Sequence, residues 1–228
     1  MPELGPVWLT ARLAGVTTAL LMLLGTPLAW WLANTRSRWR APVEALTAMP
    51  LVLPPTVLGF YLLTLLSPAA PLGRAWVALT DSTLTFSFSG LVLASVLYSL
   101  PFAVQPLQRA FESVGNEVME TAATLRATPL DAFLSVALPL SARGYLGAAV
   151  LAFAHTVGEF GVVLMVGGNI PGETRVISIA VYEHVETLRY SEAHVLSAGL
   201  MVFSFAVLLI VYGVGIGGRR DERRRAAS

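Results

Sequence analysis

A single carboxylate, Glu159, lies in the string HTVGEFGVVLMVGG, which contains no other acidic side chain. A carboxylate in an apolar environment is costly, so it usually has a function or a dedicated partner. While ionised it would repel an anion and would be a poor ligand for one. The flanking Gly158 and Gly161 would let helices approach closely. His155, four residues earlier, is a candidate partner for the carboxylate; a satisfied core histidine is the alternative.

The other reactive residue types exclude the common classes of enzyme. His155, His184 and His194 are too dispersed to predict a metal site, and the chain has no cysteine. It also has no lysine, which a Walker A loop needs to reach the nucleotide phosphates. We therefore expect no catalytic residue, metal, cofactor or nucleic-acid partner. Any ATPase that works with this chain must be a separate polypeptide.

The elements that hold these residues follow from the distribution of charge. Only 13% of the 228 residues are charged, against roughly 25% in a typical soluble domain. A helix needs about 20 apolar residues to cross a membrane. Four longer runs carry no charged side chain: Leu13–Ala33, Ala45–Gly73, Ser82–Gln108 and Val195–Gly218. A fifth span, 144–167, is interrupted only by His155 and Glu159. The sequence predicts an all-α, polytopic bundle with five spanning helices.

Arginine predicts the orientation of these spans, because all fifteen basic residues are arginine. One side of the predicted membrane holds eleven of them: Arg36, Arg38, Arg40, Arg109, Arg126, Arg143, Arg219, Arg220, Arg223, Arg224 and Arg225. The other side holds only Arg12, Arg74, Arg175 and Arg189. Basic residues accumulate in cytoplasmic loops. The N-terminus is therefore predicted outside and the C-terminus in the cytoplasm.

Prolines and apolar spacing predict the connections on the outer side. The second span contains Pro50, Pro54 and Pro55, which indicate either a packing kink or a gating hinge. The proline-rich segment Ser67–Ser82 is expected to be irregular or re-entrant. The segment Gly168–Glu192 is expected to form a helix near the membrane surface, because Ile177, Val181 and Val185 recur at helical spacing.

The inner segment, residues 110–140, is long and patterned. Val118, Ala122 and Leu125 recur at i, i+4 and i+7, which places them on one face of a helix. Pro129 ends or redirects that helix, and a second apolar group follows before Pro139. A short helix, a sharp turn and a second helix would form a protruding knob within residues 110–140. The pattern alone fits an ordinary solvated loop helix equally well.

At these residues the chain resembles the integral membrane subunits of bacterial ABC importers. Their pattern is Glu-Ala-Ala, a glycine a few residues later, and Leu-Pro about nineteen residues after the Glu. Glu120, Thr121 and Ala122 match its start, and Leu138 and Pro139 match its end. Arg126 stands where the family usually has glycine. The resemblance implies an ATPase-coupling site at Glu120, Thr121, Ala122, Ala123, Leu125, Arg126, Leu138 and Pro139.

Two further strings, PLVLPPTVLGFYLL and GEFGVVLMVGGNIPGETRVISIAVY, are similar to the molybdate permease branch. The resemblance implies a type I permease fold, with one transmembrane domain over residues 1–228 in the cytoplasmic (inner) membrane, in contact with its lipid. The implied partners are a second permease copy, a cytoplasmic ABC ATPase dimer and an extracytoplasmic molybdate-binding protein. The alternatives are a permease for sulfate or tungstate, and an ion-coupled secondary transporter.

If the chain is a permease, five residues are candidates for the translocation pathway or for helix packing: Pro54, Pro55, Gly158, Glu159 and Gly161. Two roles of Glu159 stay open. It is either a structural group, hydrogen-bonded across the bundle or between subunits, or a gate at the outer end of the pathway.

Overall fold

The computed structural model describes the backbone of residues 4–225 and the side chains of residues 4–209 other than Asn116. Every regular element among these residues is helical. The elements are α1 (Leu4–Asn34), α2 (Arg40–Ala48), η1 (Met49–Leu51), α3 (Pro55–Leu66), α4 (Pro71–Thr80), α5 (Phe88–Glu112), α6 (Asn116–Thr124), α7 (Pro129–Ala132), η2 (Phe133–Ala137), α8 (Leu138–Leu140), α9 (Ala142–Gly158), α10 (Gly161–Gly167), α11 (Ile177–Glu186) and α12 (Tyr190–Arg225). The all-α class predicted from the sequence is confirmed.

Three helical segments within the described residues are long and apolar enough to cross a membrane: α1, α5 and residues Tyr190–Leu209 of α12. Two pairs of helices reach the same length only together, and each is bent. Arg40–Leu51 meets Pro55–Leu66 at 107°, and Pro129–Leu140 meets Ala142–Gly158 at 75°. The described chain therefore has up to five spans if each bent pair counts as one. Two of the five predicted spans are not single straight helices.

The first bend follows from the proline pair in the second span. A residue before proline is driven out of the helical region, and Pro54 has φ −54° and ψ 134°. Helix α3 then starts at Pro55, where a missing N–H removes no helical hydrogen bond. The chain consequently turns sharply between η1 and α3 instead of continuing along one axis.

The core is formed by α1, α5 and α9, which pack side by side. Leu21 and Leu32 of α1, Leu107 of α5 and Ala148 of α9 are all fully buried in one cluster. The seven-residue α10 is enclosed between α3 and α5, where its Val162 and Val166 are fully buried. Short as it is, α10 is thus a buried half-helix.

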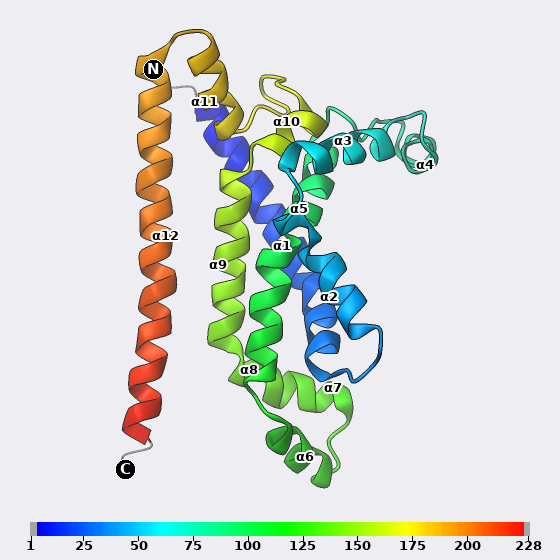
Figure 1. Ribbon diagram of the computed structural model, residues 1–228, viewed down its shortest axis with the longest axis vertical. Helices are drawn as coiled ribbons and strands as arrows, with labels where there is room; N and C mark the ends of the chain where they lie inside the picture. The colour runs from blue at the N-terminus through cyan, green and yellow to red at the C-terminus, as the bar shows by residue number, and fades with distance from the viewer. Residues whose placement is uncertain (1–3, 226–228) are drawn as a thin grey trace.

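Figure 1 shows how the elements are distributed along the molecule. Helices α6, α7 and α8 lie at one end, with α6 extending beyond the ends of α5 and α9 (Figure 1). Helices α4, α10 and α11 lie at the opposite end. Helix α12 runs beside α9 from the second end to the first. The helix–turn–helix segment within residues 110–140 therefore protrudes from the bundle, which is one of the two arrangements that the sequence pattern allows.

The segments 67–82 and 168–192 differ in how well the sequence predicts their structure. The segment Ser67–Ser82 was expected to be irregular or re-entrant, and the irregular alternative is wrong over most of its length because α4 occupies Pro71–Thr80. Pro71 stands at the first helical position of α4, where the missing N–H of proline removes no helical hydrogen bond. The helix expected within Gly168–Glu192 is present as α11, with Ile177 buried in it.

Candidate functional site

The first candidate site is the break between α9 and α10. Helix α9 ends at Gly158, and Glu159 adopts extended angles, with φ −62° and ψ 137°. Phe160 follows with φ −132° and ψ −64° before α10 begins at Gly161. The span expected over 144–167 is therefore interrupted at the carboxylate. We call Glu159 and Phe160 the α9–α10 break.

Hydroxyl groups from a neighbouring helix hold the Glu159 carboxylate. Glu159 is 3% exposed, and its two oxygens accept hydrogen bonds from Ser95 and Ser99 of α5, the second at 2.9 Å. Its backbone carbonyl accepts a hydrogen bond from the Ser178 hydroxyl of α11. A buried polar group is costly unless it is hydrogen-bonded. Glu159 meets that condition, and its hydrogen bonds link three elements: α5, the α9–α10 break and α11.

His155 is not the direct partner of this carboxylate. Its Nδ1 atom lies 3.8 Å from the nearer Glu159 oxygen, which is too far for a hydrogen bond. Instead Nδ1 is 2.9 Å from the Ser99 hydroxyl, and the ring stacks on Phe102 with 3.7 Å between centroids. The predicted contact therefore runs through Ser99. This hydroxyl also lies 3.0 Å from that of Thr156.

The sequence reasoning missed Ser95 and Ser99, although a signal for them exists. They stand four residues apart in the string SVLYS, within an otherwise apolar predicted span. Hydroxyls at this spacing share one helix face. Two hydroxyl groups on one face of a spanning helix can both donate hydrogen bonds to one buried acceptor. Both serines are fully buried here.

A cavity of about 490 Å³ adjoins the break. It is lined by Pro55, Thr56, Tyr98, Ala154, His155, Gly158, Glu159, Phe160 and Gly161. Four of the five residues singled out in the sequence thus meet at one place. The fifth, Pro54, is not among the lining residues and immediately precedes α3.

The two glycines beside Glu159 behave differently. A Cβ atom on Gly161 would lie 2.8 Å from Cβ of Pro55, so α10 approaches α3 more closely than any larger residue permits. A Cβ atom on Gly158 would have no atom of another part of the described chain within 4 Å. The close helix approach expected at both glycines is present only at Gly161.

The second candidate site is the knob, in which α6 ends in a two-bond turn. The N–H of Arg126 donates to the carbonyl of Ala123 at 3.0 Å, and that of Ala127 donates to Ala122 at 3.2 Å. This is the Schellman arrangement, in which the residue after the helix cap takes left-handed angles. That residue is Arg126, with φ 62°. The turn thus keeps the geometry that suits glycine, although the residue is arginine.

The predicted coupling residues occupy different environments in the knob. Ala122 is buried at 8% exposure, whereas Leu125 is 79% exposed. Exposed positions are Glu120, Thr121, Ala123, Arg126 and Pro139, and Leu138 is half-buried. Thr128 caps α7 by accepting a hydrogen bond from the N–H of Asp131 at 3.2 Å. The predicted helix–turn–helix is therefore present, with Pro129 starting the second helix.

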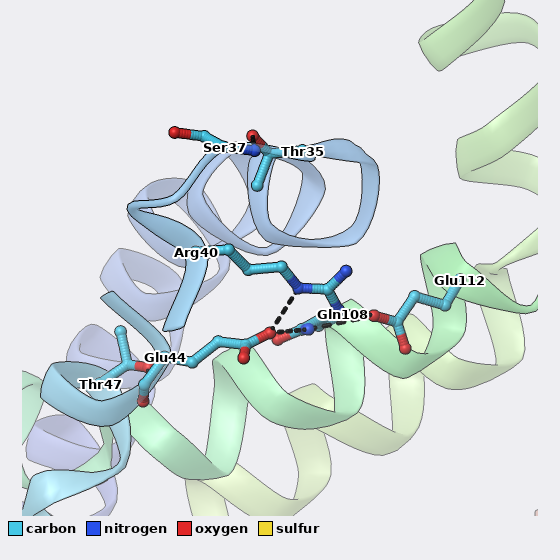
Figure 2. Close-up of polar contacts among 7 residues, drawn as sticks. All are labelled: Thr35, Ser37, Arg40, Glu44, Thr47, Gln108 and Glu112. Carbon is cyan, nitrogen blue, oxygen red and sulfur yellow. Dashed lines mark hydrogen bonds and ion pairs between the residues drawn. The ribbon is translucent and has the colours of Figure 1, made fainter. Parts of the chain in front are cut away.

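A charged network braces α5 where the chain leaves the bundle for the knob. Arg40 of α2 lies between two carboxylates, donating to Glu44 at 2.9 Å and to Glu112 at 2.7 Å (Figure 2). The Gln108 amide donates to Glu44 at 2.8 Å and to Glu112 at 3.1 Å. Glu112 is the last residue of α5. The network therefore ties α2 to the helix end that precedes α6.

Solved structures with a similar arrangement define the class of fold. A chain of the MetNI methionine ABC transporter in inward-facing conformations superposes with a TM-score of 0.67, at 19% identity, over 92% of this chain and 94% of the other. A chain of a bacterial alginate ABC transporter gives a TM-score of 0.73, at 16% identity, over 92% and 77%. At these identities the likeness is one of fold. The fold is that of an ABC transporter membrane chain.

The sequence then places the chain within that class. It belongs to the family of binding-protein-dependent transport system inner membrane components, whose family model matches residues 25–217. It is 55% identical to the molybdenum transport system permease protein ModB of Azotobacter vinelandii, over 92% of this chain and 93% of that protein. Identity to the protein of the same name in Escherichia coli K12 is 32%, over 99% and 97%. Identity to the sulfate transport system permease protein CysT of a Synechocystis strain is 33%, over 93% and 73%.

Proposed function

We propose that the chain is the membrane-spanning permease subunit of an ATP-driven importer that carries molybdate across the cytoplasmic membrane. The observation that supports molybdate is the 55% identity to the Azotobacter permease over nearly the full length of both chains. More distant relatives do not discriminate between molybdate and sulfate as the substrate, because identity is 32% to the Escherichia coli molybdenum permease and 33% to the Synechocystis sulfate permease. The difference between 55% identity to the Azotobacter molybdenum permease and 33% identity to the Synechocystis sulfate permease is what favours molybdate over sulfate.

The pathway in this proposal forms between two copies of the chain. Large apolar side chains on η1, on α3 and between them are exposed, with Val52 at 85%, Phe60 at 54% and Tyr61 at 65%. In a membrane, side chains of this kind face lipid or another membrane subunit, and the proposal assigns those of η1, α3 and their connection to the contact with the second copy. The cavity at the α9–α10 break shares Pro55 with α3, so it would lie close to this contact. Glu159 serves there as a brace, because its oxygens are directed to α5 hydroxyls.

Energy enters through the knob, on which a cytoplasmic ABC ATPase dimer docks. The chain itself has no lysine with which to build a Walker A site. The Arg40 network supports this role, because it ties the end of α5 to α2. A movement of the knob would be transmitted to the bundle through that end of α5. The coupling loop spans about residues 110–140 of a single transmembrane domain.

The knob faces the cytoplasm in this proposal, and an extracytoplasmic molybdate-binding protein delivers the anion to the end that holds α11. Two features support this orientation. The knob lies at the end toward which α12 runs (Figure 1), and α12 ends at Arg225 within an arginine-rich string. Arginine-rich segments stay on the cytoplasmic side. The N-terminus is then outside and the C-terminus inside.

Uptake by cells tests the proposal. The chain is expressed together with its own ATPase and binding protein in a bacterium that lacks its molybdate and sulfate permeases. We expect labelled molybdate to accumulate and a large excess of sulfate to compete poorly. Accumulation of labelled sulfate with little molybdate uptake would instead identify a sulfate permease.

A further inference from the structure

A groove of about 360 Å³ lies between α12 and the rest of the bundle. Its walls come from α1, α9, α11 and α12. Near the start of α12, Leu196 shares a buried cluster with Ile177 of α11. Further along α12, the ring of Phe203 lies 6.3 Å from that of Phe153 in α9. All four of these residues line the groove, so it extends along α12 from one of these contacts to the other.

The walls of the groove offer no unpaired polar side chain. Thr10 is the one residue with a polar side chain among those that line it. The Thr10 hydroxyl donates to the carbonyl of Pro6 at 2.7 Å and accepts from the N–H of Ile177 at 2.8 Å. Water has no partner in such a space, and apolar cavities stay dry. An empty groove would also deprive its walls of dispersion contacts. The groove therefore suits an apolar occupant.

The surroundings of the groove supply hydrocarbon. Helix α1 and the segment Tyr190–Leu209 of α12 are each long and apolar enough to cross a membrane. The side chains of α12 that point away from the groove are apolar and exposed, with Met201 at 71%, Val202 at 70% and Phe205 at 64%. The contact proposed for the second copy involves η1 and α3, and α3 and α12 lie on opposite sides of the bundle (Figure 1). Lipid is therefore the neighbour of α12.

We propose that the groove is a binding site for one acyl chain of a membrane phospholipid. On the exposed face of α12 a lipid chain contacts protein on one side, whereas in the groove it is contacted by α1, α9 and α12 together. The larger number of dispersion contacts holds that chain more tightly than the surrounding lipid. The bound chain then sets the separation of α12 from α9. This inference goes beyond the proposed transport function and does not depend on the substrate.

Two glycines provide a matched pair of probes. Gly199 lines the groove between Val195 and Phe203, on the same face of α12, and a Cβ atom there would meet no atom within 4 Å. Gly199→Leu therefore fills the groove without a clash. Gly15 of α1 is also exposed and has equal space around its Cβ position, but it does not line the groove. Gly15→Leu thus makes the same chemical change at an ordinary lipid-facing position.

Photolabelling in vesicles tests the inference. Wild type, Gly199→Leu, Gly15→Leu and Leu200→Trp, which enlarges another side chain of the groove, are reconstituted in phosphatidylethanolamine and phosphatidylglycerol with a trace of phospholipid that carries a diazirine in one acyl chain. We expect wild-type labelling at Phe153 to exceed that at the more exposed Val202 by about 5-fold. Native mass spectrometry after mild detergent extraction should show a single retained phospholipid. Both signals should disappear in Gly199→Leu and Leu200→Trp and persist in Gly15→Leu, with the Tm of each variant confirming that it is folded.

Three results would overturn the inference. Labelling that follows exposure alone, with no phospholipid retained by wild type, would show ordinary bilayer contact. Unchanged labelling and retention in folded Gly199→Leu and Leu200→Trp would place the lipid elsewhere. An unlabelled groove, together with a disulfide between two copies of Gly199→Cys, would identify the second copy as the occupant.

Discussion

At the scale of single residues, Glu159 shows how a carboxylate can belong to an apolar bundle. Ser95 and Ser99 donate to its two oxygens, and Ser178 donates to its carbonyl. Both carboxylate oxygens and the backbone carbonyl of Glu159 therefore accept hydrogen bonds from hydroxyl groups of other helices. A residue that joins α5, the α9–α10 break and α11 in this way is better suited to fix their relative positions than to bind an anion.

Replacing Glu159 separates its charge from its hydrogen bonds. Glu159→Gln retains an acceptor and a donor that can meet the two α5 hydroxyls, because serine both donates and accepts. We expect it to assemble and transport nearly as wild type does. Glu159→Ala leaves the Ser95 hydroxyl without its hydrogen-bond partner, removes one of the three partners of Ser99 and opens a cavity, which together should cost about 2–5 kcal/mol of stability. Thermal unfolding of the purified variants measures the difference.

The gate hypothesis makes the opposite prediction for the same glutamine variant. If the negative charge keeps anions from leaking, vesicles with the assembled Glu159→Gln transporter would pass oxyanion without ATP turnover. A substantial flux of that kind would show that the charge is a barrier and that the brace is not its main role. We expect no such flux.

At the scale of elements, the packing of α10 against α3 depends on one glycine. Gly161→Ala places a methyl group 2.8 Å from Cβ of Pro55, which belongs to a rigid ring. We expect a loss of about 1–3 kcal/mol, because an overpacked contact must shift backbone. Gly158→Ala is the matched control, since its methyl group meets nothing within 4 Å. It should be neutral or stabilising by up to about 1 kcal/mol. Equal losses in the two variants would refute this account of the contact.

The sequence predicts several elements well because their signals are local. Charge-free runs find α1, α5 and α12, and apolar spacing finds α11 and the first helix of the knob. The α9–α10 break was not predicted, because Glu159 and its flanking glycines were interpreted as packing features within one continuous span. The break depends instead on tertiary contacts, namely the α5 serines that hold Glu159 and the close approach of Gly161 to Pro55. The helix α4 was missed because Pro71 reads equally as a breaker or as a first helical residue.

The sequence likewise located the candidate sites but did not predict their geometry. The string pattern located the knob and Arg126, but only the structure gives the φ of 62° that shows the turn to be strained. The sequence also placed His155 within reach of Glu159 by helical spacing. The chain leaves the helix at Gly158, so that spacing no longer applies and Ser99 lies between them instead.

At the scale of the whole molecule, the absence of cysteine makes the orientation directly measurable. Glu173→Cys introduces an exposed thiol at the end that holds α11, and Leu125→Cys introduces one in the knob, where the leucine is 79% exposed. In cells whose outer membrane is permeabilised and whose inner membrane is intact, a membrane-impermeant maleimide should label Glu173→Cys and should not label Leu125→Cys. Labelling of Leu125→Cys without disruption of the inner membrane would contradict the proposed orientation.

The central claim is that the chain is one part of an ATP-driven importer and moves no substrate alone. The most direct measurement is molybdate uptake into vesicles that contain the purified chain with or without its ABC ATPase. The molybdate-binding protein is supplied on the side of the α11 end, and ATP is supplied on the side of the knob. We predict concentrative uptake only when all components and ATP are present, and neither ATP hydrolysis nor accumulation by the chain alone. Concentrative uptake by the isolated chain, driven by a proton or sodium gradient, would contradict the account.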